Sequence, residues 1–272
     1  MRIQHNIQSL NAQRNLTKNN NALNKNIEKL SSGFRINRAG DDAAGLAISE
    51  KMRGQIRGLN QAVNNANDGN SLIKTAEGAL DQSHQILQRM RELSVQSANG
   101  TYQDDVDREN IDKEITALKS EIDRISSSTH FNKINHLDGT ADITFQIGAN
   151  GTADQQVALT IADMSAEGVG VKDVTCATRE EASEAIATID DAINTVSSTR
   201  ADLGALQNRL EYTVDNLSTT SENLQAAESR IRDADMAKEM SEMTKNNILA
   251  QAAQSMLAQA NAQPQGVLSL LQ

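Results

Sequence analysis

One apolar repeat constrains the fold of this chain more than any other feature of its sequence. In the second half of the chain an apolar side chain recurs at every seventh position, at Ile189, Val196, Leu203, Leu210, Leu217, Leu224 and Ile231. A helix with this period carries a continuous apolar stripe, which it buries by supercoiling around partner helices. The repeat therefore predicts a long helix in a coiled coil or helical bundle.

Shorter repeats of the same kind precede this stretch and can supply its partners. Their apolar residues step by four and three positions, at Leu23, Ile27, Leu30 and Phe34, again from Met52 to Val63, and again from Ile111 to Ile125. The single proline is Pro264, so no proline breaks an earlier helix. Aromatic residues make up only 2% of the chain, which favours aliphatic helix seams over a core built on rings. We expect the chain to run out as helices and to return as one long helix.

In the middle of the chain the apolar period changes to two. Apolar and polar residues alternate in two runs, with apolar positions at Ile143, Phe145 and Ile147 and at Val157, Leu159 and Ile161. The turn-rich stretch Gly148 to Gly151 lies between the runs, so we expect a β-hairpin over residues 142–162. The fold class is then mainly α: a long antiparallel coiled coil or helical bundle formed by both chain ends, with a small β-hairpin insert at the outer tip. Residues 142–178 are expected to be replaceable by a short linker, because turn-rich segments flank the hairpin.

Two polar stretches interrupt the first helical arm. They are Ser31 to Gly33 and Ala39 to Asp42. The carboxylate of Asp41 or Asp42 can accept hydrogen bonds from the free backbone N–H groups that begin the next helix. We therefore expect one of these two residues to cap it.

The two ends of the chain carry thinner apolar stripes than the middle. Residues 1–30 are rich in Asn and Gln, and the stretch from 236 to 260 is rich in Ala and Gln, with apolar anchors at Met236, Met240, Met243, Met256 and Leu257. Helices with so little apolar surface are marginal alone, because packing supplies most helix stability. We expect both ends to be disordered in a free monomer and helical once other helices cover them. A membrane-surface role fits less well, since these ends lack dense Lys and Arg opposite Trp and Phe.

The charge balance argues against nucleic acid and anionic membranes as partners. The formal net charge is −10, although residues 1–60 hold ten Lys and Arg against four Asp and Glu. An acidic chain is repelled by phosphate backbones and anionic lipids. No run of 18 apolar residues is present, so membrane insertion is not expected.

The residue types that carry chemistry do not form a recognisable site. The sequence has neither an HExxH metalloprotease motif nor a glycine-rich phosphate loop. His130 and His136 flank a turn beside Asp138, and a solvated turn explains them better than a metal site. Cys176 is the single cysteine, and its place among small residues is typical of an incidental thiol. We expect no enzymatic activity, no cofactor and no metal.

Several sequence blocks closely resemble bacterial flagellin, the family of flagellar filament subunits. They are LSSGFRINRAGDDAAGLAI at 30–48, TAEGALDQSHQILQRMRELSVQSA at 75–98, LGALQNRL at 203–210, NLQAAESRIRDADMA at 223–237 and ANAQPQGVLSLL at 260–271. The resemblance covers nearly the whole chain apart from residues 139–181. Alternatives are a hook–filament junction protein with similar ends or, in a different class, an intracellular coiled-coil adaptor.

The resemblance implies a domain organisation, a function and a location. Residues 1–40 and 232–272 would form an inner coiled-coil domain that lines the filament core. Residues 41–138 and 182–231 would form a helical bundle, and 139–181 a small outward region. The chain would be exported unfolded through the flagellar channel and assemble with copies of itself into the extracellular filament used for motility. Its partners would include an export chaperone on the C-terminal stretch, the filament cap and the hook-junction proteins.

The resemblance also implies recognition by a vertebrate flagellin-sensing Toll-like receptor. Arg89, Leu93 and Glu114 are the residues that match the receptor-contacting positions of the family. Arg89 and Leu93 are four residues apart, so on a helix they would share a face. The same face is expected to contact a neighbouring subunit in a filament.

Overall fold

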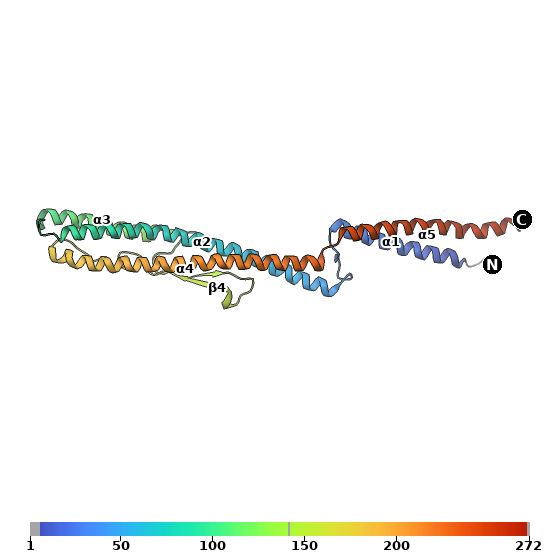
Figure 1. The fold of residues 1–272 in the computed structure, drawn as a ribbon, viewed down its shortest axis with the longest axis horizontal. Helices are drawn as coiled ribbons and strands as arrows, with labels where there is room; N and C mark the ends of the chain where they lie inside the picture. The colour runs from blue at the N-terminus through green and yellow to red at the C-terminus, as the bar shows by residue number, and fades with distance from the viewer. Residues whose placement is uncertain (1–5, 141, 271–272) are drawn as a thin grey trace. The chain divides into compact units, whose positions relative to one another are not determined.

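The computed structural model describes residues 6–140 and 142–270, and it is mainly helical, as expected (Figure 1). The helices are α1 (Ile7–Ser32), α2 (Ala43–Ser97), α3 (Glu109–Ser128), α4 (Arg179–Arg232) and α5 (Met236–Leu270). A π-helical turn at Asp104–Arg108 precedes α3. The strands are β1 (His130–Phe131), β2 (Ile134–Asn135), β3 (Asp142–Gln146) and β4 (Gln156–Thr160), with a 3-10 turn at Ala153–Gln155 before β4. Among the described helices, none has the length and apolar character that crossing a bilayer requires.

The chain forms two compact units whose boundaries lie inside its two longest helices. The central unit is Gln55–Ser221, and the terminal unit consists of the chain up to Gly54 together with the chain from Glu222 onward. The boundaries predicted from the sequence, 40/41 and 231/232, lie close to the start of α2 and the end of α4, whereas the two units divide inside these helices. Residues 139–181 belong to the central unit and do not form a third one.

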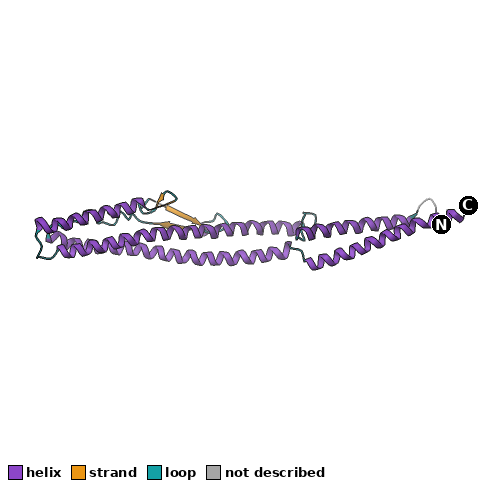
Figure 2. Cartoon of the chain, turned by 90° about the horizontal axis from the view of Figure 1, so that it is seen from above, coloured by secondary structure: helices purple, strands orange, loops and turns teal. Residues whose placement is uncertain are grey.

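The core of the central unit lies between α2, α3 and α4, which run side by side (Figures 1 and 2). From Ile189 to Leu217 the repeat residues of α4 are at most 9% exposed. The inward residues of α2 and α3 that pack in the same core are Leu80, Leu87, Met90, Leu93, Ile115 and Ile122. A seven-residue period thus places its whole stripe against two other helices in this unit.

The predicted hairpin is present, but it is part of this core. β3 pairs antiparallel with β4, from Asp142 opposite Thr160 to Gln146 opposite Gln156. Residues of β4 and of the segment after it are buried in the same cluster as the helices: Leu159, Ile161, Met164, Val171 and Cys176. This burial argues against the expectation that residues 142–178 can be exchanged for a linker, because the segment supplies one wall of the core.

Glycine at position 69 of α2 allows the hairpin to approach closely. A Cβ at Gly69 would lie 3.2 Å from the ring of Phe145 and 3.3 Å from Leu210 Cδ1, whereas one at Gly78 would meet nothing within 4 Å. Alanine in place of a helical glycine normally stabilises by about 0.5–1 kcal/mol. We expect Gly78→Ala to raise the free energy of unfolding by about this amount, and Gly69→Ala to gain less or to lose stability. Urea unfolding followed by circular dichroism measures both; equal gains would contradict the close approach.

In the terminal unit α1 packs against α5. The α1 seam passes through the half-buried Leu23 and Leu30, but Asn26 is buried between them, while Ile27 is 49% exposed. In the single chain Ile27 therefore lies outside the α1–α5 seam, one position from the buried Asn26. Polar contacts also join α1 and its N-cap to α5: Lys29 Nζ to Glu239 Oε1 at 3.1 Å, Asn6 Nδ2 to the Ala260 carbonyl at 2.7 Å, and Ser9 Oγ to Asn261 Oδ1 at 2.7 Å.

Local contacts define where α1 ends and where α2 and α5 begin. Gly33 adopts φ 74° and its N–H closes α1 on the Lys29 carbonyl at 2.8 Å, a conformation that favours glycine. Asp42 caps α2, as one of two predicted candidates, because its Oδ1 accepts from Gly45 N at 2.9 Å. The single return helix expected from the sequence is two helices, α4 and α5. α5 begins at Met236 after the capping residue Asp235, whose Oδ1 accepts a hydrogen bond from Lys238 N at 3.1 Å.

Candidate assembly and recognition surfaces

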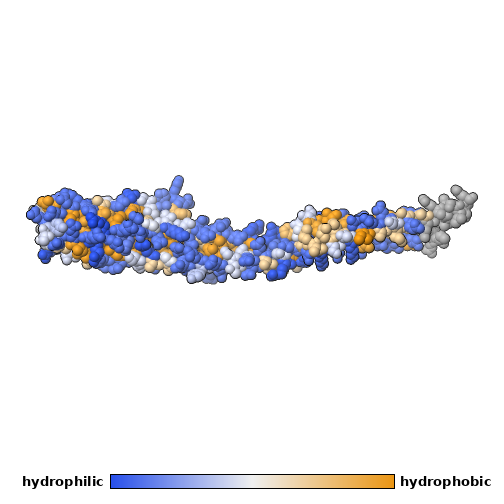
Figure 3. Space-filling view, turned by 45° about the horizontal axis from the view of Figure 1, so that its top comes forward, coloured by the Kyte–Doolittle hydropathy of each residue, from blue (hydrophilic) through white to orange (hydrophobic). Residues whose placement is uncertain are grey.

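The helix pair of the terminal unit leaves an unusual amount of large apolar surface open. Figure 3 shows apolar side chains gathered at its surface. The most exposed of them are Ile7 (56%), Leu10 (59%), Ile27 (49%), Met236 (48%), Met240 (49%), Ile248 (61%), Leu249 (42%) and Met256 (64%). Two helices bury only one stripe of each other, so apolar side chains on the remaining faces stay in water. Contiguous apolar surface of this kind marks an interaction site.

The predicted contact residues of α5 differ in their exposure in the single chain. Met236, Met240 and Met256 are exposed, whereas Met243 and Leu257 are half-buried in this unit. The side chains of the first three are free to contact a partner, and methionine adapts its shape to imperfect seams. Met243 and Leu257 are placed to pack within the chain.

The break between α4 and α5 is fastened to the break after α1 by backbone and side-chain contacts. Arg35 N donates to the Arg232 carbonyl at 2.7 Å, and Ala234 N donates to the Gly33 carbonyl at 2.9 Å. The Arg232 guanidinium lies 4.8 Å from the centre of the Phe34 ring and bonds Glu50 Oε1 at 2.7 Å. The bond from Arg232 lowers the pKa of Glu50 below its ordinary value. These contacts hold the two breaks together within the terminal unit.

Two of the three predicted receptor-contacting residues meet on the surface of the central unit, and the third does not join them. Arg89 of α2 donates from Nε and Nη2 to Glu114 Oε1 of α3 at 3.0 and 2.9 Å, and from Nη1 to Glu92 Oε2 at 3.3 Å. The bond with Glu114 is the largest cause that raises the pKa of Arg89. Leu93 is only 2% exposed, because the inward stripe of α2 steps through Met90 to it. The exposed group is thus Arg89, Glu92 and Glu114.

A buried arginine that sequence reasoning missed organises the loop between α2 and α3. Arg108 is 4% exposed and donates to the carbonyls of Ser97, Asn99 and Tyr102 at 2.7, 2.8 and 2.8 Å. These carbonyls lie at the end of α2 and just after it, where helical partners are lacking. The signal was present in the sequence, since Arg108 occupies the position three residues before Ile111 on the apolar stripe of α3.

Cys176 is an inert, buried thiol. Its Sγ lies 3.3 Å from Ser94 Oγ, its carbonyl accepts from Ser97 Oγ at 2.8 Å, and its N–H donates to Asp112 Oδ1 at 2.9 Å. Burial raises the pKa of the thiol, which disfavours the reactive thiolate. The side chain serves the core as a small apolar group.

His130 and His136, at the two ends of the β1–β2 pair, have opposite environments. His130 is exposed, but His136 is 3% exposed, so the interpretation of both as a solvated turn is wrong for His136. Neither ring nitrogen of His136 has a hydrogen-bond partner in the described chain. No three potential metal-ligating side chains come together among the described residues.

Acidification is expected to destabilise the central unit through His136. Burial lowers the pKa of His136 below 6.5, against smaller opposing effects of the Phe131 backbone and Asp138. The unfolded chain therefore takes up a proton at a higher pH than the folded chain, and stability falls as the pH falls below 6.5. His136→Phe should flatten the dependence of the urea midpoint on pH between about pH 7 and about pH 5. The exposed control His130→Phe should leave the slope unchanged; the same slope in both variants would contradict the assignment.

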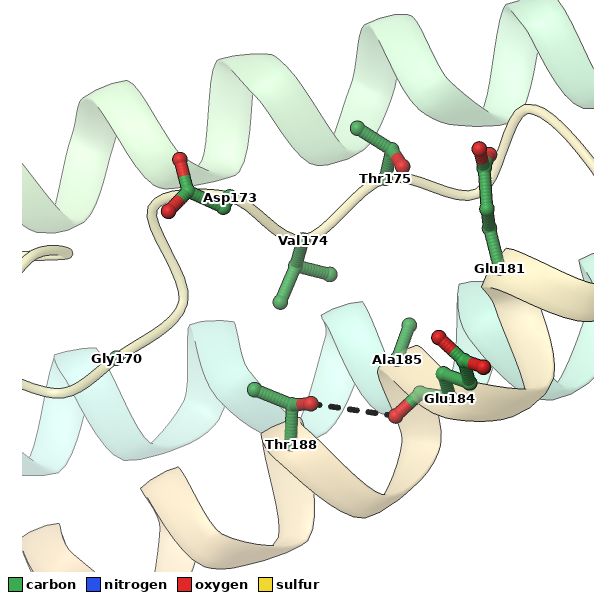
Figure 4. A pocket seen from close by; sticks show the side chains of 8 residues that line it. All are labelled: Gly170, Asp173, Val174, Thr175, Glu181, Glu184, Ala185 and Thr188. Atoms are coloured by element: carbon green, nitrogen blue, oxygen red, sulfur yellow. Dashed lines mark hydrogen bonds between the residues drawn. The ribbon is translucent and has the colours of Figure 1, made fainter.

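A shallow pocket of about 190 Å³ beside the start of α4 does not resemble a ligand site. It is lined by Asp173, Glu181 and Glu184 among small residues, and Figure 4 shows that the three carboxylates do not converge on one point. Thr188 Oγ1 donates to the Glu184 carbonyl at 3.2 Å, and Glu181 Oε2 accepts from Thr178 N at 3.2 Å. The polar groups around this hollow therefore serve the start of α4.

Comparison with known proteins gives a consistent result over the whole chain. The model of the bacterial flagellin N-terminal helical region matches residues 3–142, and the model of the C-terminal helical region matches residues 186–271. The flagellin of Bacillus subtilis (strain 168) is 56% identical, with 100% of both chains covered. The flagellar filament 33 kDa core protein of Treponema phagedenis is 53% identical, again over 100% of both chains. The crystal structure of Bacillus cereus flagellin matches with a TM-score of 0.50 and 33% identity, over 61% of this chain and 94% of that one.

Proposed function

Because this chain belongs to the bacterial flagellin family, we propose that it is a structural subunit that assembles with copies of itself into the extracellular flagellar filament. The observation that carries the proposal is the open apolar surface of the α1–α5 pair, where Leu10, Ile248 and Met256 are each more than half exposed. Copies of the same chain offer the same surface, so repeated side-by-side packing can bury it. The whole-length identity to flagellins favours this function over a hook–filament junction protein or an intracellular adaptor.

The test is polymerisation of the purified chain on fragments of its own filament. Added monomer should lengthen the fragments in electron micrographs, and the gain should require both chain ends. A version that lacks residues 1–30 should not add to the fragments, because α1 and the surface that it carries are then missing. Monomer that stays unpolymerised on intact seeds, under conditions in which seeds persist, would contradict the proposal.

The same surface supports a proposal about export. Exposed Met236, Met240 and Met256 would invite self-association before export. A cytoplasmic chaperone that covers α5 during export through the flagellar channel would prevent this, and the filament cap and hook-junction proteins would meet the same helices afterwards. Catalysis has no place in this function, since the family is one of structural proteins.

Receptor recognition is proposed for the exposed group on α2 and α3. Arg89→Ala should weaken binding of the monomer to the ectodomain of the flagellin-sensing Toll-like receptor by roughly tenfold or more, as an interfacial arginine does. Arg91→Ala is the matched control, because Arg91 also lies on α2 and is paired to Asp190 at 2.6 Å. Surface plasmon resonance compares the two. Equal affinity of the Arg89 and Arg91 variants would overturn the assignment.

The predicted role of Leu93 in recognition changes with its burial. Leu93→Ala removes a core side chain, which typically costs about 2–5 kcal/mol of stability. Any loss of receptor binding should therefore follow the loss of folded protein and not occur in fully folded samples.

A further inference from the structure

The loop between β3 and β4 contains an asparagine followed by a glycine, Asn150–Gly151, and both residues are exposed. A Cβ added at Gly151 would meet nothing within 4 Å, so the glycine is not required by packing. In such a pair the backbone nitrogen of the second residue can attack the side-chain carbonyl carbon of the first. The absence of a Cβ on glycine leaves that path open.

The surroundings of Asn150 hold its backbone and leave its side chain free. Its N–H donates to Gln155 Oε1 at 2.6 Å, and its carbonyl accepts from Gln146 Nε2 at 2.7 Å. In the part of the chain that the structure describes, no group bonds to the Asn150 side-chain amide. The Gln146 bond draws electron density from the peptide that joins Asn150 to Gly151, which stabilises the negative charge left when its nitrogen loses a proton.

The chain contains a second pair, Asn99–Gly100, that differs in this respect. The Asn99 side-chain oxygen accepts from Thr101 N at 3.4 Å, and its backbone N–H donates to the Gln96 carbonyl at 3.2 Å. Its own carbonyl accepts from Arg108 Nη2 at 2.8 Å, so a polarised peptide is common to both pairs. The freedom of the side chain is what distinguishes Asn150.

We propose that Asn150 is a self-modifying site, at which the folded protein converts asparagine to a mixture of aspartate and isoaspartate. The Gly151 nitrogen loses its proton to hydroxide and forms a bond to the Asn150 side-chain carbon. The bond from that carbon to the amide nitrogen breaks, and the nitrogen takes a proton from water and leaves as ammonia, which regenerates hydroxide. Water then opens the resulting succinimide at either carbonyl, which gives a carboxylate in the side chain or a backbone extended by one methylene. No oxidant or reductant is needed.

The modification changes a packing contact as well as a charge. A Cβ at Gly58 of α2 would lie 2.8 Å from Ala149 Cβ, so the loop residue before Asn150 sits directly on the helix. A new carboxylate, or an extra backbone methylene, adjoins this contact. Conversion of Asn150 therefore loosens the tip of the hairpin from α2 as the protein ages.

The experiment is incubation of the full chain in mildly alkaline buffer, with peptide mapping by mass spectrometry and isoaspartate labelling by isoaspartyl methyltransferase. We expect conversion at Asn150 to be several-fold faster than at Asn99 in the folded protein, and the two rates to approach each other in urea. Gly151→Ala should slow conversion at Asn150 several-fold, while Gly100→Ala, where a Cβ also meets nothing within 4 Å, should leave it unchanged. Slower conversion at Asn150 than at Asn99 in the folded chain, or no effect of Gly151→Ala, would overturn the proposal.

Discussion

Exchange of residues 142–178 for a flexible linker is expected to abolish cooperative folding of the central unit. Leu159, Ile161, Met164 and Val171 are all at most 5% exposed and belong to one cluster with α2, α3 and α4. Loss of a single buried Leu or Ile side chain to alanine costs about 2–5 kcal/mol. A whole domain is stable by only about 5–15 kcal/mol, so the combined loss exceeds what the unit can sustain.

The experiment compares this exchange with an insertion that keeps every core residue. The same linker placed between Asn150 and Gly151 lengthens an exposed loop and should be tolerated, since loop insertions cost little. Urea unfolding by circular dichroism should show a cooperative transition for the insertion and a broad or absent one for the exchange. Leu159→Ala alone should already lower the unfolding free energy by about 2–5 kcal/mol. A cooperative transition of unchanged midpoint after the exchange would show that the segment is a separable tip.

Replacement of Ile248 and Met256 by lysine is expected to abolish filament growth while the monomer remains soluble. Both side chains are more than 60% exposed in the single chain, so their loss removes little intramolecular packing. If they pack between subunits, each lysine places an unpaired charge in a desolvated seam, at a cost of several kcal/mol per subunit. A helical polymer repeats this cost in every subunit, so we expect growth to be lost completely and not merely slowed.

The matched control is Ile248→Leu with Met256→Leu, which keeps apolar side chains of similar volume. Seeded polymerisation followed by light scattering should be lost in the lysine variant and retained in the leucine variant. Thermal unfolding of the central unit should be the same in both, because neither position lies in it. Growth of the lysine variant at the unsubstituted rate would place the subunit contacts elsewhere.

The sequence predicted the elements of this fold better than their contacts. The repeat from Ile189 to Leu217 could be read because a seven-residue period depends only on helix geometry. The hairpin could be read because strands alternate strictly. The burial of the hairpin could not be predicted, because it depends on a close approach of Phe145 to Gly69 of α2. These two residues are far apart in the sequence and meet only in the folded chain.

The failures at single residues have physical reasons as well. Ile27 continues the four-and-three apolar spacing of the sequence, but the buried position is Asn26, because polar residues do occur in coiled-coil seams. Arg89 and Leu93 were predicted to share a face because four residues make about one helical turn. That spacing does not tell which of the two side chains points toward the core. The break before α5 contains neither glycine nor proline. The feature of the sequence that indicates a new helix there is Asp235, which caps α5.

Methionine oxidation in monomer and filament tests the central claim most directly. Peroxide converts exposed methionine to the sulfoxide, and burial slows the reaction. Met236, Met240 and Met256 are 48%, 49% and 64% exposed, whereas Met90 and Met164 are at most 2% exposed and serve as internal references. We predict that the first three oxidise rapidly in the monomer and slowly in the filament, while the references stay slow in both. Equal oxidation of the three in monomer and filament would contradict burial of the α1–α5 surface between subunits.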